Sequence, residues 1–177
     1  MKPLEVETLV DLIKERLSQP VSIKLRIAES AADILERNVG TIVNAWYGRV
    51  TAEARITQIA LSREERTAHL PTLLHELISR LRPPRKANSS GSPAGVLQGT
   101  LRHTQGYTAH MLVMESRILQ VSLFEVLHHN LSSVDFSLIL LDVMAIADEV
   151  DFQLEQTIET YLEQRKRSEA EDVEDVA

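Results

Sequence analysis

Hydrophobic residues recur at helical spacing along almost the whole chain. Leu9, Leu12, Ile13 and Leu17 share one face of a helix predicted over residues 4–17. A second helical stretch is predicted over 22–53, with this apolar stripe: Ile27, Ala31, Ile34, Leu35, Val39, Ile42, Val43, Trp46 and Val50. The sequence contains no sustained alternation of apolar and polar residues, and six glycines are few for a turn-rich β protein. The pattern predicts an all-α fold.

The middle of the chain carries helix boundary signals. Ser62 and Glu65 have the spacing of a capping box, which predicts a helix over 63–69. Pro71 lacks a backbone donor and restricts the residues before it, so a kink and a second segment over 71–82 are expected. The proline-, serine- and glycine-rich stretch 83–93 predicts a loop.

Two long helices are predicted after this loop, over 94–130 and 134–166, with Ser132 or Ser133 as the N-cap of the second. Apolar residues in the last helix alternate in steps of four and three, the repeat of a coiled-coil seam: Phe136, Leu140, Val143, Ala147, Val150, Leu154, Thr157 and Tyr161. A further apolar set is confined to its first half: Leu138, Ile139, Leu141, Met144 and Ile146. This pattern favours a helix that leaves the domain and pairs with a second copy. The alternative is an ordinary bundle helix with a frayed end.

Charge divides the chain unevenly. The net charge is −7, but the last ten residues hold five acidic residues and no basic one, and residues 1–167 carry 21 acidic and 19 basic residues. We therefore expect an N-terminal helix over 1–20, one domain over 21–166 and a disordered acidic tail over 167–177. A nearly neutral body argues against nucleic-acid binding, which requires clustered basic residues.

Composition excludes several classes of protein. The chain has no cysteine, hence no disulfide, thiolate metal site or cysteine nucleophile. The N-terminal stretch has acidic residues where a signal peptide needs an apolar run, and the most apolar window, 136–147, is too short to span a bilayer. We expect a cytoplasmic protein that does not bind membranes.

Six histidines raise the question of a metal or haem site. None of the histidine pairs has the i,i+4 spacing with which one helix chelates an ion, so no metal site is predicted. Haem needs only one axial histidine, and His69, His103 and His110 are the candidates. Because haem pockets are usually rich in aromatic residues and only 4% of this chain is aromatic, we expect no cofactor.

Catalytic motifs are missing from the sequence. No serine lies in a G-x-S-x-G turn, and no glycine-rich phosphate loop is present. Paired acids such as Glu64 and Glu65 are adjacent rather than facing one another. We therefore predict that the chain is not an enzyme.

The stretch "RHTQGYTAHMLVMESRIL" (102–119) resembles one amphipathic helix that keeps Gly106 and Glu115 at unexpected places. A glycine inside a helix lowers its stability by about 1 kcal/mol relative to alanine. A close approach of another backbone or of a ligand would offset this loss. Glu115 lies one turn from Leu112 and Leu119, so burial would require a partner. Arg102 would be too far along this helix to reach it, and Arg117 would face elsewhere. The candidate partners are Arg49, Arg55 and His69; alternatively, Glu115 points to water.

The order and spacing of several residues resemble a known family. These residues are Trp46, the run His69-Leu70-Pro71, Arg102, Gly106, Tyr107, Glu115 and Arg117. Together they resemble the RsbRD-type N-terminal domain of RsbT co-antagonist proteins, the input module of stressosome-like systems, over roughly residues 25–160. Two positions depart from the family pattern: Gln98 stands where a histidine is frequent, and Ser116 where an aromatic residue is common.

This resemblance implies an all-α, globin-like helical bundle that binds no haem, forms a homodimer and regulates a partner such as a sulfate-transporter/anti-sigma-antagonist (STAS) protein or a kinase. The dimer helix would use Leu140, Val143, Ala147, Val150, Leu154 and Tyr161. The expected function is a non-enzymatic signal-input and dimerisation domain. A haem- or ligand-binding sensor and a purely structural self-assembly module remain alternatives.

Overall fold

The computed structural model describes Lys14 and residues 28–82 and 91–174. All the named secondary-structure elements in these residues are helices. The helix predicted over 4–17 and most of the predicted loop therefore lie outside the described residues. The helices are α2 (Ala31–Arg37), α3 (Val39–Thr51), α4 (Ala54–Thr57), α5 (Arg63–Thr67), α6 (Leu70–Leu81), α7 (Pro93–Thr104), α8 (Ala109–His129) and α9 (Ile139–Glu174). The predicted all-α fold class is confirmed.

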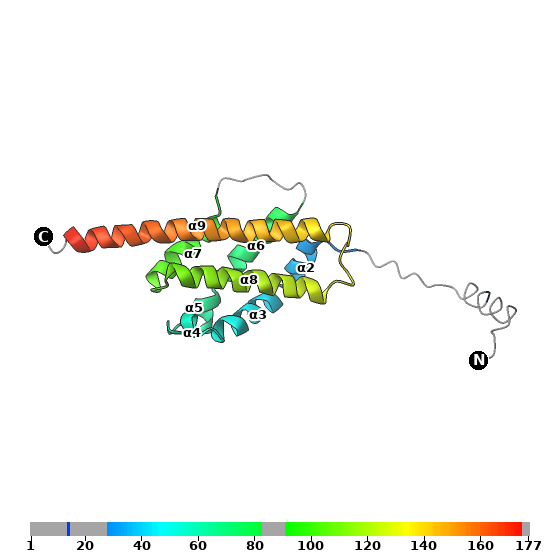
Figure 1. Ribbon diagram of the computed structural model, residues 1–177, viewed down its shortest axis with the longest axis horizontal. Coiled ribbons are helices and arrows are strands. Elements are labelled where there is room, and N and C mark those ends of the chain that lie inside the picture. Colours follow the sequence, from blue (N-terminus) through cyan, green and yellow to red (C-terminus); the bar gives the residue numbers. More distant parts are fainter. Residues whose placement is uncertain (1–13, 15–27, 83–90, 175–177) are drawn as a thin grey trace, which may run out of the picture.

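In the described part of the chain, α6, α7 and α8 pack along the long helix α9, and α3, α4 and α5 lie on the far side of α8 (Figure 1). At 1.5 Å per residue the 36 residues of α9 extend about 54 Å. Its C-terminal turns reach past the ends of α7 and α8 (Figure 1). None of the described helices is both long and apolar enough to cross a membrane.

One hydrophobic core joins these helices, with side chains contributed from Ala31 in α2 to Tyr161 in α9. The predicted stripe accounts for much of it, because Ile34, Ile42 and Trp46 are fully buried. The single helical stretch predicted over 22–53 is two helices in the described residues. The first begins at Ala31, and Asn38 separates α2 from α3.

The capping box and the break before Pro71 are confirmed, although α5 ends at Thr67 rather than 69 and α6 spans Leu70–Leu81 rather than 71–82. Ser62 accepts from the Glu65 backbone N–H, and the Glu65 carboxylate accepts from the Ser62 backbone N–H, which completes the capping box of α5. Pro71 occupies the first turn of α6, where its missing donor leaves no hydrogen bond unmade.

Two predictions for the long helices were wrong. The stretch 94–130 is two helices, α7 and α8, separated by a turn at 105–108. The last helix begins at Ile139 rather than 134, and it continues to Glu174, through most of the tail expected to be disordered. An Arg165–Glu169 ion pair at i,i+4 spacing supports these late turns.

Backbone hydrogen bonds join Glu29, just before α2, to the turn before α9. The backbone N–H of Glu29 donates to the Ser133 carbonyl over 2.8 Å, and the Asp135 N–H donates back to Glu29 over 3.3 Å. Val134 forms an isolated parallel bridge with Glu29, and α9 begins only at Ile139, so neither Ser132 nor Ser133 caps it.

Candidate functional site

The turn between α7 and α8 determines the geometry of the site. Gly106 has φ +77°, and nothing would lie within 4 Å of a Cβ there. Its N–H donates to the His103 carbonyl and the Tyr107 N–H donates to the Arg102 carbonyl, which is the Schellman arrangement that closes a helix. Gly106 is therefore present for its left-handed backbone, and the predicted close approach of another backbone is wrong.

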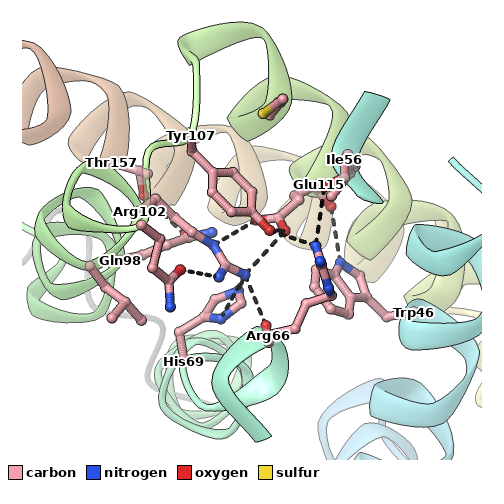
Figure 2. Close-up of polar contacts among 12 residues, drawn as sticks. Trp46, Ile56, Arg66, His69, Gln98, Arg102, Tyr107, Glu115 and Thr157 are labelled. Atoms are coloured by element: carbon pink, nitrogen blue, oxygen red, sulfur yellow. Dashed lines mark hydrogen bonds and ion pairs between the residues drawn. The ribbon is translucent and has the colours of Figure 1, made fainter. Parts of the chain in front are cut away.

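Glu115 is buried and paired with Arg102. The Arg102 Nε donates to Glu115 Oε2 over 3.0 Å and Nη2 donates to Oε1 over 3.1 Å. The two side chains are 0% and 1% exposed. The prediction that Arg102 could not reach Glu115 assumed one continuous helix. The turn at Gly106 changes the direction of the chain between α7 and α8, and the two side chains face each other (Figure 2).

Tyr107 connects this pair to a second buried arginine. Its hydroxyl donates to Glu115 Oε1 over 2.9 Å and accepts from Arg66 Nη1 over 2.9 Å. Its ring also lies 4.4 Å from the Arg102 guanidinium carbon. Burial and the neighbouring carboxylate raise the pKa of the Tyr107 phenol well above its ordinary value, so it remains a donor.

His69 and Trp46 complete the group, which we name the buried polar cluster: Trp46, Arg66, His69, Arg102, Tyr107 and Glu115 (Figure 2). Burial, and secondarily the charge of Arg102, hold the pKa of His69 well below its ordinary value. A neutral ring is consistent with Arg102 Nη2 donating to His69 Nδ1 over 3.3 Å. The Trp46 indole packs edge-on against His69 and donates to the Glu115 backbone carbonyl over 3.1 Å.

The cluster contains two guanidinium groups and one carboxylate. Burial raises the pKa of Glu115, while Arg102, Tyr107 and Arg66 oppose the rise. Because both of its oxygens accept hydrogen bonds, we describe it as a carboxylate. The second cation, Arg66, is satisfied by the carbonyl oxygens of Ile56 and Ile59. The cluster thus ties α5, α6, α7, α8 and the turn after α4 together by directed bonds.

The remaining predicted partners of Glu115 lie elsewhere. Arg49 pairs with Glu125 over 2.8 Å on the surface, and Arg55 contacts His110 over 3.1 Å. Only His69 reaches the cluster, and it does so through Arg102. Arg117 is exposed and lines a shallow groove of about 180 Å³ between α3 and α8. Of the residues that carry the family resemblance, Arg117 lies outside the site, as do Leu70, Pro71 and Gly106.

The three candidate haem ligands do not share a pocket. His103 packs against Tyr161, His110 is exposed, and His69 is enclosed in the cluster. The cavity beside His69 has a volume of about 10 Å³, which is the space for a single water molecule. A porphyrin does not fit this site without displacing the core. Among the described residues, no three His, Asp or Glu side chains gather as a metal site.

The close contact between α7 and α9 was not predicted from the sequence. A Cβ on Gly95 would lie 2.7 Å from the Gln153 carbonyl oxygen, and one on Gly99 would lie 2.5 Å from the Thr157 carbonyl oxygen. The Thr157 hydroxyl is 3.1 Å from the Gly95 carbonyl oxygen and 3.2 Å from Gln98 Oε1. The G-x-x-x-G spacing was the signal in the sequence. Close backbone packing here buries one face of α9.

That packing changes the predicted dimer helix. Val150 and Tyr161 are 3% and 7% exposed because helices of the same chain cover them, and Leu154 is partly buried against the core. The predicted seam over 150–161 is therefore an intrachain contact. Val143 and Ala147 are half-buried, while Leu140 is 70% exposed.

Comparison with models of known protein families, with curated proteins and with solved structures finds no match to this chain.

Proposed function

We propose that this chain is a non-enzymatic signal-input domain of the RsbRD type, cytoplasmic and homodimeric, that regulates a separate STAS protein or kinase. One observation carries the proposal. Five residues of the family-like pattern, spread from Trp46 to Glu115 along the chain, contact one another in the buried polar cluster. Residues brought together in this way support the resemblance better than their order in the sequence does.

The state of these residues favours a structural role over catalysis. A general acid or base must reach its substrate, and a nucleophile needs space for one. The carboxylate, the imidazole and both guanidinium groups of the cluster are at most 3% exposed, and each has a protein partner. We infer that the cluster holds the input domain in one packing arrangement.

The proposed pairing surface is the exposed apolar face at the start of α9, which we name the α9 face. It consists of Phe136, Leu138, Leu140, Leu141 and Met144, each at least 44% exposed. Exposed apolar residues gathered in the turn before α9 and in its first turns favour a protein contact. A second copy suits them because an apolar helix face can be self-complementary about a two-fold axis. This replaces the longer seam expected from the sequence.

Helix α9 is also the proposed route from input to output. Its first half carries the α9 face, its middle packs on the glycines of α7, and Leu162 and the residues after it are mainly exposed. A ligand or partner that binds one position of α9 more tightly than another would shift the whole helix towards that position. We propose that the downstream partner binds these C-terminal turns.

Calorimetric titration of the full chain with purified STAS-domain proteins and histidine kinases from the same genome tests this function. We expect one of them to bind, and Leu162→Glu to weaken that binding at least tenfold, whereas Leu97→Glu, a matched control at an exposed leucine of α7, leaves it unchanged. Absence of binding to every such protein by the folded chain would contradict the proposal. A Soret band on addition of haem that is lost in His69→Ala would favour the haem-sensor alternative instead.

A further inference from the structure

A second buried charged group lies between α6, α7 and α9, away from the polar cluster. Arg80 of α6 donates from Nη1 to Glu149 Oε2 of α9 over 3.1 Å, and from Nη2 to Glu76 Oε1 over 2.8 Å. Its Nη2 also donates to the Gly91 carbonyl over 2.8 Å. The other Glu76 oxygen accepts from the backbone N–H of Ala94 at the start of α7. One guanidinium thus joins three segments.

The charges of this group are unequal. Two carboxylates face one guanidinium, and all three side chains are largely enclosed, with exposures of 17% for Glu76, 19% for Arg80 and 9% for Glu149. Both Glu76 oxygens have donors. In Glu149, Oε1 is buried without a hydrogen-bond partner among the described residues, and it is the only such side-chain atom in them. A buried carboxylate oxygen without a donor disfavours the charged form.

Protonation would remove this imbalance. With Glu149 neutral, one carboxylate, Glu76, and one guanidinium, Arg80, remain in the group, both on α6. With Glu149 charged, the contact carries an excess negative charge among largely enclosed side chains. Burial, followed by the repulsion from Glu76, raises the pKa of Glu149 to about 7, although Arg80 and the neighbouring Gln153 amide act in the opposite direction.

We propose that Glu149 is a proton-operated contact through which pH near neutrality changes how tightly α6 and the start of α7 hold α9. The charged groups that face it are Glu76 and Arg80 of α6, and Gln153 is its polar neighbour on α9. The start of α7 contributes backbone groups to the same contact. Residues 83–90 lie outside the described residues. The biological use of this contact as a signal rests on the proposed function, whereas the titration itself does not.

The direction of the effect follows from linkage. The folded chain holds its Glu149 proton to a higher pH than the unfolded chain, in which the carboxyl has an ordinary pKa. The stabilising effect is therefore complete at low pH and is lost as the pH rises towards and through about 7. Above this pH, Glu149 is charged, its contact with α6 is less favourable, and α9 is held less tightly.

Two measurements on the full chain test the proposal. The first is a carbon-13 NMR titration of the assigned Glu149 carboxyl in the wild-type protein, which needs no variant to fold. The second is thermal unfolding from pH 5.5 to 8.5 of wild type, Glu149→Gln and the matched control Glu155→Gln, an exposed glutamate on the same helix. Glu149→Gln mimics the protonated side chain and keeps its volume.

We expect the Glu149 carboxyl to titrate between pH 6 and 8. The melting temperature of wild type should fall relative to Glu149→Gln by roughly 5 °C over this pH range, and wild type and Glu155→Gln should remain parallel. Titration of Glu149 below pH 5.5, or parallel curves for wild type and Glu149→Gln, would overturn the proposal. Neither result depends on whether the chain binds a STAS protein or a kinase, so a failure here is distinct from a failure of the proposed function.

Discussion

Replacing Glu115 by glutamine tests the role of the buried polar cluster. The substitution keeps the size of the side chain but removes the charge that Arg102 contacts through two hydrogen bonds of 3.0 and 3.1 Å. The Arg102 and Arg66 guanidinium groups are then left in an environment at most 3% exposed without a carboxylate. Removing one member of a buried ion pair costs about 3–5 kcal/mol. We expect a loss of this size.

Urea denaturation gives this value directly. Far-ultraviolet circular dichroism follows the helices, and fluorescence of Trp46, the single tryptophan of the chain, follows the cluster itself because its indole donates to the Glu115 carbonyl. The matched control is Glu125→Gln, which breaks the half-exposed Arg49–Glu125 pair and should cost less than about 1 kcal/mol.

A double-mutant cycle separates the pair from its surroundings. Arg102→Met combined with Glu115→Gln should cost less than the sum of the two single substitutions, by about 2 kcal/mol, because the first change already removes the contact that the second one breaks. If Glu115→Gln costs no more than Glu125→Gln, or if the two substitutions are additive, the cluster does not hold the helices together and our account of it is wrong.

Four further substitutions test other parts of the structure, each by the same denaturation assay. Gly99→Ala should destabilise by about 1–3 kcal/mol, because the new Cβ would meet the Thr157 carbonyl at 2.5 Å. Gly48→Ala, a helical glycine with nothing within 4 Å, should instead stabilise by about 0.5–1 kcal/mol, and a loss at both sites would contradict the packing explanation. Gly106→Ala should cost about 1 kcal/mol because of its φ of +77°, and a gain would contradict the left-handed turn. Tyr107→Phe should cost about 1–3 kcal/mol, because it removes the hydroxyl between the buried carboxylate and guanidinium; an unchanged stability would show that this hydroxyl is dispensable.

Features that depend on neighbours in sequence could be predicted. The capping box of Ser62 and Glu65, the first-turn position of Pro71 and the buried stripe through Ile42 and Trp46 all follow from local spacing. For the same reason, the all-α class could be predicted from the sequence. Several members of the cluster were singled out by the resemblance to the RsbRD-type domain rather than by local spacing. Local patterns encode caps, breaks and buried faces because each involves only a turn or two of helix.

The turn at Gly106 was missed although its signals are present. A glycine in an apolar periodic stretch is compatible with both a helix interior and a helix end. Thr108, two residues later, is the N-cap of α8, and a threonine at this place is a signal for the start of a new helix. This single error also hid the pairing of Arg102 with Glu115, since their distance depends on whether the chain turns between them.

Contacts between distant elements could not be derived from one sequence. Arg66 lies in a run of charged residues that is typical of an exposed helix, yet it is 3% exposed. Glu149 likewise appears as one acid among several on a long helix, and only packing against Arg80 distinguishes it. The burial of Val150 depends on the helices packed against α9. Helical periodicity defines a face without identifying its neighbour.

Sedimentation equilibrium of the full chain tests most directly whether α9 pairs with a second copy. The chain has a mass of 19.9 kDa, so we predict a species of about 40 kDa for wild type and for Leu97→Glu, whose leucine is exposed on α7. Leu140→Glu, on the α9 face, should give a folded species of about 20 kDa, because it places a charge in the proposed contact. A wild-type chain that stays at 19.9 kDa at every concentration, or a dimer that Leu140→Glu leaves intact, would contradict this account.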